Sequence, residues 1–439
     1  MSATGGVIVA APASGSGKTV FTLGLLRHLV RSGVKVASAK AGPDYIDPAF
    51  HAAATGRPCP NLDIWAMRPE TLAAAVGTVA AGAELVVCEG VMGLFDGATA
   101  SAGSTADLAL ATGWPVVMVI DVRAQGASAA AVLGGFARHR PGVEVAGVVF
   151  NRIGSPRHAE QIRDACRDAL PHIPILGFLP RVADLALPER HLGLVQAGEH
   201  AGLSAFLDRA AVLIAEHVDW RTIARLAKPA KTTTTSPRPI APLGQRIAVA
   251  RDTAFAFAYP LTLEGWRAAG AELSFFSPLA NETPPSSADA VYLPGGYPEL
   301  HAGKLAENET FLGGLRAAAD RGAIVAGECG GYMVLGTGLV DADGKRHAMA
   351  GLLPVETSFA RPKLHLGYRA TTLVGDGPLG RKGDGFRGHE FHYAETVSEG
   401  PGMALFRCRD ASGKDIGATG LVAGNVAGSF VHLIDRTGA

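Results

Sequence analysis

The sequence predicts an α/β fold with two domains, and three observations lead to that prediction. The chain has 439 residues, which is enough for two to three domains at roughly 150 residues each. Its 56 glycines and recurring short runs of Val, Ile and Leu are typical of parallel strands buried on both faces. A stretch with four prolines and a threonine run, 228–242, separates two series of such runs. We therefore expect domains at 1–227 and 244–439, joined by a linker at 228–243.

Apolar runs alternate with helical patterns in both predicted domains. The runs of the first domain lie at 7–11, 34–39, 85–88, 116–120 and 145–150. This series predicts βαβ units and one parallel sheet. After the linker the alternation restarts, with runs at 247–250, 273–276, 290–293 and 323–326. We therefore expect a second α/β domain.

Charge and cysteine content exclude several classes of protein. Forty Lys and Arg residues balance forty Asp and Glu residues, so no global positive field would hold nucleic acid or an anionic membrane. No apolar run approaches the roughly 18 residues that cross a bilayer, and the first residues lack the features of a signal peptide. The five cysteines are too few and too scattered for a disulfide framework or a zinc site. The sequence thus predicts a cytoplasmic protein that binds neither nucleic acid nor membrane, and it leaves a homodimer open.

A phosphate-binding loop follows the first predicted strand. The segment 12–19 reads Pro-Ala-Ser-Gly-Ser-Gly-Lys-Thr and leads into a helical pattern. In such a loop the backbone N–H groups surround phosphate oxygens, Lys18 reaches the outer phosphates, and the Thr19 hydroxyl suits Mg²⁺. Pro12 departs from the usual pattern, which has Gly five residues before Gly17. The residues expected at the nucleotide are Ser14, Gly15, Ser16, Gly17, Lys18 and Thr19.

Four acidic residues follow two strands that end at the same edge of the sheet. Asp44 and Asp47 follow the second predicted strand, and Glu89 and Asp96 follow the third. Ligands bind at the carboxyl edge of such sheets. Because carboxylates and a triphosphate repel each other unless a cation lies between them, all four are candidate Mg²⁺ ligands together with Thr19. Asp44 and Asp96 also suit turns next to Pro and Gly.

Two further polar residues end strands of the first domain. Asp121 follows 116–120, and Asn151 follows 145–150. The amide of Asn151 is a candidate for reading the nucleotide base, although Asn is also frequent at strand ends.

A cysteine marks the second domain. Cys329 lies in a Gly-x-Cys-x-Gly segment, 327–331, whose spacing matches the sharp strand-to-helix turn that exposes a nucleophile. The helix that follows would lower the pKa of the thiol. Cys88, by contrast, lies inside a predicted strand and suits a buried structural role. The glycines expected to aim backbone N–H groups at an oxyanion are Gly295, Gly296 and Gly330.

A cysteine nucleophile needs a base, and three histidines are candidates. His432 closes the apolar segment 428–432, which we interpret as one strand. In the segment 388–393, an extended backbone would put His389 and Phe391 on one face and Glu390 and His392 on the other. The residues alone do not choose among His389, His392 and His432.

The whole chain resembles the cobyrinic acid a,c-diamide synthases of cobalamin biosynthesis, including their hydrogenobyrinic acid counterparts. Six segments carry the resemblance, in the order of that family and across both domains. They lie at 11–19, 40–48, 89–97, 295–299, 327–336 and 388–393. The resemblance implies a dethiobiotin-synthetase-like P-loop domain joined to a class I glutamine amidotransferase domain.

The resemblance also implies roles for individual residues. Cys329 would hydrolyse glutamine, with His432 as the base, and would release ammonia. The first domain would use ATP and Mg²⁺ to phosphorylate the a and c acetate carboxylates of a corrinoid tetrapyrrole, and ammonia would displace the phosphate. Lys40 and Lys18 would neutralise charge on the transferring phosphoryl group. The residues expected to border the acceptor are Asp44, Tyr45 and Ile46.

The chain departs from the amidotransferase pattern at one position, and the sequence leaves several other functions open. Ordinary class I amidotransferases have Glu two residues after the histidine, where this chain has Ile434, so we expect a Cys329–His432 pair with Glu390 as a candidate orienter. Nickel-sirohydrochlorin a,c-diamide synthase is an alternative, and cobyric acid synthase would require a different segment at 44–47. A partitioning-type switch ATPase would have a signature Lys at Ala13 and no amidotransferase half. The Ala-, Gly- and Arg-rich composition favours the cobalt-free acceptor, hydrogenobyrinic acid.

Overall fold

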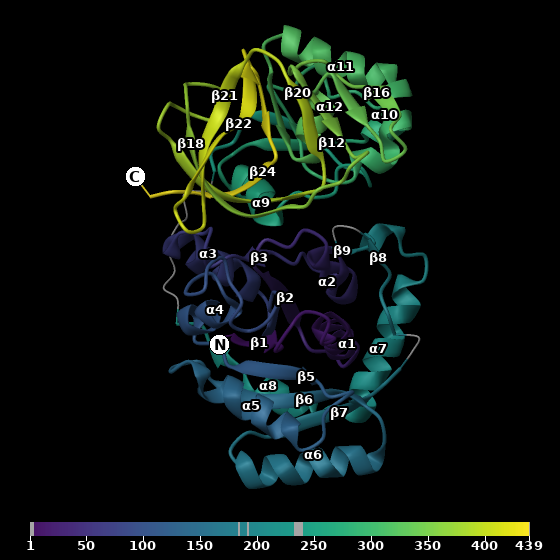
Figure 1. Cartoon of the computed structure of the whole chain (residues 1–439), viewed down its shortest axis with the longest axis vertical. Coiled ribbons are helices and arrows are strands. Elements are labelled where there is room, and N and C mark those ends of the chain that lie inside the picture. The colour runs from purple at the N-terminus through teal and green to yellow at the C-terminus, as the bar shows by residue number, and fades with distance from the viewer. Residues whose placement is uncertain (1–3, 183–184, 191–192, 232–239, 439) are drawn as a thin grey trace. The chain divides into compact units, whose positions relative to one another are not determined.

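The computed structural model of the chain describes residues 4–182, 185–190, 193–231 and 240–438 (Figure 1). The chain divides into two compact units, residues 1–65 with 69–236 and residues 66–68 with 237–439. The segment expected to be a linker, 228–243, includes 232–239, which lie outside the described residues. Its first two residues form a short strand, β10 (Lys228–Pro229), which pairs antiparallel with β1 of the first unit.

The first unit is built on a parallel sheet with the strand order β3-β2-β4-β1-β5-β6-β7. All five predicted apolar runs form strands of this sheet, which confirms the βαβ prediction. Its strands are β1 (Gly5–Ala10), β2 (Val36–Ala41), β3 (Asn61–Leu62), β4 (Leu85–Glu89), β5 (Val116–Asp121), β6 (Val145–Ile153) and β7 (Ile175–Pro180). A separate small pair consists of β8 (Glu189–Arg190) and β9 (Gly193–Leu194).

Helices connect these strands and cover the sheet. They are α1 (Lys18–Arg31), α2 (Asp47–Thr55), α3 (Pro69–Ala80), α4 (Thr105–Thr112), α5 (Ser128–His139), α6 (Pro156–Ala169), η1 (Ala197–Glu199), α7 (Leu203–His217) and α8 (Trp220–Leu226). Figure 1 shows α5 and α6 beside β5, β6 and β7. Helix α1 packs closely on α7, since a Cβ atom on Gly24 would lie 2.7 Å from the carbonyl oxygen of Ala210.

The strand order decides which loops meet. Strand β1 lies between β4 and β5, and β2 lies on the other side of β4. Because these strands are parallel, the loops that follow β2, β4, β1 and β5 are neighbours at one edge of the sheet. Three of the sequence segments singled out above, 12–19, 40–48 and 89–97, lie in these loops.

The second unit contains a ten-stranded sheet that is parallel in one half and antiparallel in the other. Its order is β12-β11-β13-β14-β23-β22-β21-β18-β19-β24. Its strands are β11 (Arg246–Ala250), β12 (Glu272–Phe276), β13 (Ala290–Leu293), β14 (Ile324–Glu328), β18 (His365–Leu373), β19 (Gly385–His392), β21 (Met403–Asp410), β22 (Asp415–Ala423), β23 (Val426–Ser429) and β24 (Val431–Arg436). A smaller sheet contains β15 (Gly338–Val340), β16 (Arg346–Ala348), β17 (Val355–Ser358) and β20 (Glu395–Glu399).

Helices pack on both faces of the parallel half. They are α9 (Pro260–Ala268), η2 (Pro278–Ala280), η3 (Pro298–His301), α10 (Ala302–Glu307), α11 (Glu309–Asp320) and α12 (Gly330–Leu335). Ile247 of β11 packs in one apolar cluster with Trp266 of α9, whereas Ala248 belongs to a second cluster with Leu315 of α11. Successive residues of one strand therefore face different helices, as its period of two requires.

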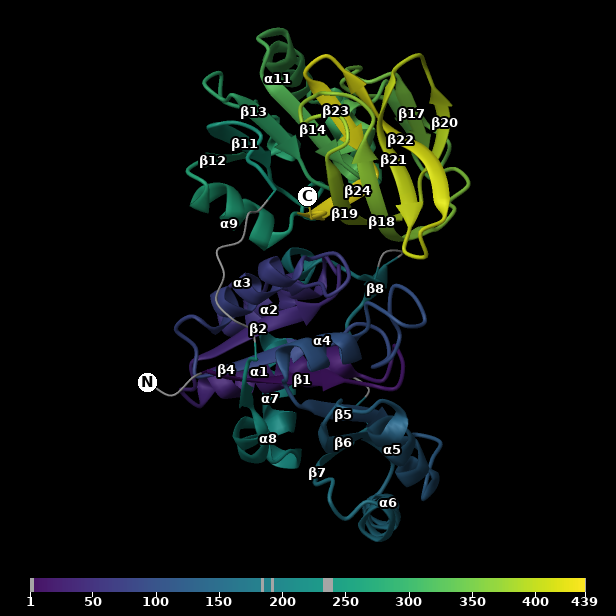
Figure 2. The same ribbon diagram turned by 90° about the vertical axis from the view of Figure 1, so that its left-hand side faces the viewer.

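The second half of this unit differs from the predicted alternation of strands and helices. After α12 the described residues form strands and no helix, and Figure 2 shows the long antiparallel strands β18, β19, β21 and β22 side by side. The interpretation of 428–432 as one strand was wrong, because β23 ends at Ser429 and β24 begins at Val431. The Ser429 hydroxyl accepts the backbone N–H of Val431 at 3.1 Å, and such a local bond replaces a ladder bond. Strand β23 then pairs with β14, and β24 pairs with β19.

None of the helices in the described residues is both long and apolar enough to span a bilayer.

Candidate active sites

The loop 12–19 joins β1 to α1 and presents its backbone at the carboxyl edge of the sheet. Gly17 precedes α1 with φ at 93°, and a Cβ atom there would lie 2.2 Å from Nδ2 of Asn151, so only glycine fits. Ser14 and Gly15 are exposed and border a pocket together with Asp121. Ser16 is buried, and its hydroxyl donates to the carbonyl oxygen of Ala13 at 2.8 Å.

Lys18 lies under the loop that follows β4. Its side chain is buried, and Nζ donates a 2.6 Å hydrogen bond to the carbonyl oxygen of Met92. Burial lowers the pKa of Lys18, and the nearby carboxylate of Glu89 acts in the opposite direction. The ammonium group is therefore held at the junction of the phosphate-binding loop and the loop after β4.

Glu89, the last residue of β4, is the centre of a buried polar cluster. Its Oε1 accepts from the Thr19 hydroxyl at 2.7 Å and from Lys40 Nζ at 2.9 Å, while Oε2 lies 2.7 Å from Nε2 of His51. Burial tends to raise the pKa of Glu89, but Lys40, His51 and Thr19 outweigh it and hold that pKa below its ordinary value. Glu89 is therefore a carboxylate in contact with the first turn of α1.

Lys40 and Asp47 complete this cluster. Lys40 Nζ lies 2.5 Å from Oδ2 of Asp47, and both side chains are almost fully buried. Burial works to lower the pKa of Lys40, but Asp47 and Glu89 together raise it well above its ordinary value. Burial, with a contribution from Asp44, raises the pKa of Asp47 to about 6. One ammonium group thus bridges two carboxylates next to Thr19.

The other two predicted carboxylates fix turns. Asp44 Oδ1 accepts the backbone N–H groups of Ile46 and Asp47 at 2.8 and 2.9 Å, ahead of α2. Asp96 Oδ2 accepts the N–H of Gly93 at 3.0 Å. Both contacts match the turn-forming role that the sequence left open. In the expected acceptor loop, the side chain of Ile46 is buried and Tyr45 is half-buried.

Asn151 and its neighbour hold the phosphate-binding loop from the side of β6. Asn151 Nδ2 donates to the carbonyl oxygen of Ser16 at 2.9 Å. Arg152, which the sequence analysis missed, has φ at 64°, donates to the carbonyl oxygen of Gly15 at 2.9 Å, and forms an ion pair with Asp121. In this structure the Asn151 amide therefore supports the loop backbone.

His51 is a second residue that the sequence analysis missed. It lies on α2, is fully buried and contacts Glu89. Burial works to lower its pKa, but Cys59 and Glu89 outweigh that effect and raise it to about 10. One signal was available, because His51 follows Asp47 by four residues on a helix, a spacing that puts both side chains on one face.

Cys329 occupies a strained turn between β14 and α12. Its φ is 48°, a value that non-glycine residues rarely adopt, and its side chain is buried. Its backbone N–H donates to the carbonyl oxygen of Ser429 at 2.8 Å, and Sγ lies 4.0 Å from the carbonyl oxygen of Phe391. The prediction that the helix after Cys329 lowers the pKa of its thiol was wrong. Burial raises the pKa of Cys329, and the opposing backbone N–H of Gly330 does not compensate.

The three predicted oxyanion glycines gather around this cysteine. A Cβ atom on Gly295 would lie 3.2 Å from Cβ of Cys329, and one on Gly330 would lie 3.1 Å from the backbone nitrogen of Gly296. The same position on Gly295 would be 2.4 Å from Cε1 and 2.9 Å from Nε2 of His432. The backbone can approach both side chains here only because residue 295 has no side chain.

The structure separates the three candidate histidines. His432 of β24 is fully buried, lies beside Gly295 and Cys329, and pairs in the ladder with His389 of β19. Burial, with contributions from His389 and His392, lowers the pKa of His432 to about 3. His392 instead contacts Glu390 and the carbonyl oxygen of Ala394. His432 and Cys329 thus both border Gly295, whereas the ring of His392 is engaged by Glu390 and Ala394.

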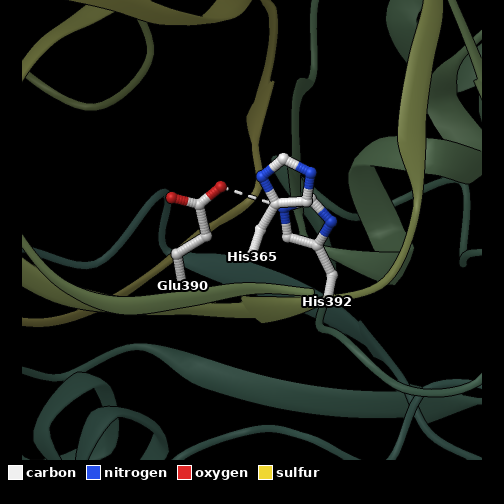
Figure 3. Close-up of side chains that lie close together, drawn as sticks. All are labelled: His365, Glu390 and His392. Carbon is white, nitrogen blue, oxygen red and sulfur yellow. Dashed lines mark hydrogen bonds and ion pairs between the residues drawn. The ribbon is translucent and has the colours of Figure 1, made fainter. Parts of the chain in front are cut away.

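Figure 3 shows a cluster of His365, Glu390 and His392 on strands β18 and β19. Glu390 Oε1 lies 2.9 Å from Nε2 of His392, and its Oε2 accepts from Arg369 Nε at 2.6 Å. The rings of His365 and His392 are stacked, with an interplanar angle of 6° and centroids 4.7 Å apart. Because a metal lies close to the plane of each imidazole that binds it, two stacked parallel rings do not direct their nitrogens at one ion. The cluster is a hydrogen-bonded and stacked network.

Comparison with known proteins covers both units. Residues 7–195 match the family described as CobQ/CobB/MinD/ParA nucleotide binding domain, and residues 246–438 match the family described as CobB/CobQ-like glutamine amidotransferase domain. The chain is 55% identical over 434 residues to the hydrogenobyrinate a,c-diamide synthase of Rhizobium meliloti, covering 98% of this chain and 99% of that protein. It is 53% identical over 433 residues to the protein of the same name from Rhodobacter capsulatus, covering 98% of each.

Proposed function

The chain belongs to the hydrogenobyrinate a,c-diamide synthase family, and from that premise we propose how its two sites divide one reaction. The enzyme uses ATP and glutamine to convert carboxylates of a tetrapyrrole into carboxamides, in cobalamin biosynthesis. Hydrogenobyrinate is the acceptor, and its a and c acetate side chains are the groups amidated. The expectation of a cobalt-free acceptor agrees with the names of the relatives. We propose that the reaction takes place in the cytoplasm, where ATP and glutamine are available.

Glutamine hydrolysis is proposed at Cys329. Proton transfer from the thiol to His432 gives a thiolate that attacks the side-chain carbonyl carbon of glutamine, forming a C–S bond. The N–H groups near Gly295, Gly296 and Gly330 stabilise the resulting oxyanion. The C–N bond then breaks, and ammonia leaves with the proton from His432. Water hydrolyses the thioester, which releases glutamate and restores the thiol.

Carboxylate activation is proposed at the phosphate-binding loop of the first unit. An acceptor carboxylate oxygen attacks the γ-phosphorus of ATP, so that ADP leaves and an acyl phosphate forms. Ammonia then attacks the acyl carbon and phosphate leaves, because phosphate is a far better leaving group than hydroxide. Lys18 and Lys40 supply positive charge next to the transferring group. Two such cycles use two ATP and two glutamine molecules for each diamide.

The residues at the end of β4 fit Mg²⁺. The Thr19 hydroxyl and the Glu89 carboxylate are hard oxygen donors only 2.7 Å apart, and Asp47 reaches the same cluster through Lys40. We propose that Thr19 and Glu89 hold the ion, with Asp47 next to it. Bound there, Mg²⁺ would offset phosphate charge during phosphoryl transfer. Asp44 and Asp96 contribute by fixing their loops.

We further propose that the loop 44–46 borders the acceptor. Tyr45 is half-buried, whereas Ile46 is buried and supports the loop from within. Both reacting carboxylates of one ring must reach the same phosphate site in turn. Tyr45 is therefore the residue of this loop that we expect to influence which acetate reacts first.

One observation carries the two-site proposal: Cys329, at φ 48°, shares its surroundings with His432 and the Gly295 backbone, in a unit that lacks the phosphate-binding loop. The test offers the purified enzyme hydrogenobyrinate with ATP and glutamine, and measures the mass increase of the product. Parallel reactions use cobyrinic acid and nickel-sirohydrochlorin as acceptors. We expect diamide with hydrogenobyrinate. Amidation of only another tetrapyrrole would refute the acceptor, and ATP-independent amidation would refute the role of the first unit.

A further inference from the structure

The residue before the nucleophile has a position that the sequence did not suggest. Glu328 is the last residue of β14, and Cys329 begins the strained turn. The carboxylate side chain is 16% exposed, and the side chain of His432 is fully buried beside it. A charged group at this depth requires partners, since burial of an unpaired carboxylate is costly.

Two donors fix the Glu328 carboxylate. Its Oε2 accepts a 2.7 Å hydrogen bond from the Tyr292 hydroxyl of β13, and Oε1 accepts the backbone N–H of Leu433 at 3.2 Å. Leu433 directly follows His432 on β24. The carboxylate is therefore tied to the same strand that carries the histidine.

The two nitrogen atoms of His432 face different groups. Nδ1 lies 3.8 Å from Oε2 of Glu328. The opposite edge of the ring, with Cε1 and Nε2, is next to Gly295, whose own neighbour is Cβ of Cys329. The order carboxylate, Nδ1, Nε2, thiol is the order of a catalytic triad.

The sequence offered Glu390 as the candidate to orient His432, and the contacts of Glu390 argue against that role. Its two oxygens are engaged by Arg369 and His392, as described above (Figure 3). The residue two positions after His432 is Ile434, which has no polar side chain. The carboxylate of Glu328, by contrast, lies within ion-pair distance of His432.

We propose that Glu328 is the positioning residue for His432, holding Nδ1 as the donor and stabilising the imidazolium, so that Cys329, His432 and Glu328 act as a triad. This inference rests on the glutamine hydrolysis proposed above. The distance of 3.8 Å closes to a hydrogen bond when the proton moves to His432, as catalytic contacts often tighten only in the reacting complex. In this chain Glu328, the residue before the nucleophile, would take the place of the glutamate that ordinary class I amidotransferases have two residues after the histidine.

The buried imidazole of His432 needs a negative charge near it when it is protonated. Burial, with contributions from His389 and His392, lowers the pKa of His432, and the charge of Glu390 offsets this only in part. The carboxylate of Glu328, 3.8 Å from Nδ1, would supply further negative charge. Burial also raises the pKa of Glu328 to about 7, although Tyr292 and Leu433 partly offset that effect. Because only the ionised carboxylate stabilises an imidazolium, the rate of glutamine hydrolysis should increase as the pH rises through about 7. The other titratable groups around this pair are Tyr259, Tyr292, Glu299, Cys329, His389, Glu390 and His392.

The test compares Glu328→Gln with Glu328→Asp and with the rival variant Glu390→Gln, in the full-length enzyme. Glu328→Gln should lower kcat of glutamine-dependent amidation by roughly 10- to 100-fold, with little change in KM for glutamine. Amidation with ammonium should persist, because it bypasses Cys329. Glu328→Asp should recover part of the loss, since it restores a negative charge.

Thiol reactivity gives a readout that a purely structural role would not change. The rate at which iodoacetamide alkylates Cys329 can be measured at a series of pH values from the mass of the Cys329 peptide. The midpoint of this pH profile should move about 1 to 2 pH units higher in Glu328→Gln. The Glu390→Gln profile should stay near that of the wild type. An unchanged profile in Glu328→Gln, or a larger shift in Glu390→Gln, would overturn the proposal.

Two further outcomes separate this inference from the proposed function. If Glu328→Gln loses amidation with both glutamine and ammonium and also has a lowered Tm, Glu328 is a structural residue and its positioning role is overturned. Failure of the wild-type enzyme to amidate hydrogenobyrinate would instead refute the proposed function, and the alkylation profile would still report on the triad.

Discussion

His51 Nε2 lies 2.7 Å from Oε2 of Glu89, and both side chains are fully buried. Thr19 and Lys40 contact Oε1 of Glu89, so His51 supports the carboxylate that we propose to hold Mg²⁺ through its other oxygen. The contact links helix α2 to the end of β4. Loss of this contact should therefore mainly lower the free energy of unfolding of the first unit.

We predict that His51→Ala destabilises the first unit by about 2 kcal/mol, because one oxygen of a buried carboxylate loses its partner. Urea unfolding of the full chain would measure the change, with His172→Ala as the control at an exposed position. The control should unfold like the wild type. Equal stability of His51→Ala and the wild type would show that water or a rotamer change replaces the histidine.

Lys18→Gln should lower ATP-dependent amidation by at least about 100-fold, the scale on which one charge-stabilising donor acts. Lys35 is exposed and belongs to no site described above, so Lys35→Gln is the matched control. Because Lys18 is buried against Met92, the variant also needs a thermal melt. Amidation at the wild-type rate would refute the assignment of the phosphate-binding loop.

The strands that carry the first site were predictable because each is a continuous apolar run followed by small or acidic residues. Residues 85–88 illustrate this, since they are fully buried in β4 and end at Glu89. The position of Cys329 was predictable for a similar reason, as glycines at 327 and 331 permit the sharp turn. In both cases the local sequence alone requires the geometry.

Other parts depend on contacts between distant residues, which local patterns do not contain. The role of Glu328 requires the start of β24 to lie next to the last residue of β14, and the chain breaks between β23 and β24 at Phe430, where the Ser429 hydroxyl accepts the N–H of Val431. Arg152 reaches Gly15 only because its backbone adopts a positive φ. The pKa of Cys329 is raised by burial, which outweighs the local helix effect that the sequence suggested.

The two acidic loops of the first unit should respond differently to substitution. Glu89→Gln should raise the Mg²⁺ concentration needed for half-maximal amidation and lower the maximal rate, because a neutral amide is a weaker ligand. Asp44→Asn should stay within about threefold of the wild type, since an Asn side-chain oxygen still accepts the N–H groups of Ile46 and Asp47. Magnesium titrations of both variants measure this contrast. Equal effects would make Asp44 a ligand as well.

Gly295→Ala should abolish glutamine-dependent amidation and spare the reaction with ammonium. The added methyl group would lie 2.4 Å from Cε1 of His432, which must then move away from Cys329. Gly313→Ala on α11 is the control, since nothing lies within 4 Å of its added methyl group and alanine favours a helix. Glutamate release and product mass distinguish the two. Normal glutamine use by Gly295→Ala would contradict the close packing of this site.

Cys329→Ser should separate the two halves of the reaction. A serine hydroxyl is a far poorer nucleophile than a thiolate, so glutamine-dependent amidation should fall to background. The first unit is unchanged, and the acyl phosphate formed beside Lys18 needs only a nitrogen nucleophile. Ammonium at high concentration, at a pH that supplies free NH₃, should therefore restore the diamide.

The same variant also tests whether Cys329 is only structural. That role predicts that glutamine and ammonium fail together and that the Tm falls, because a buried thiol is replaced by a hydroxyl that must find a partner. Product mass with each nitrogen source, measured beside a thermal melt, distinguishes the two roles. Loss of both activities in a variant with a wild-type Tm would refute the release of ammonia as the link between the two sites, since the first site alone should then still use ammonium.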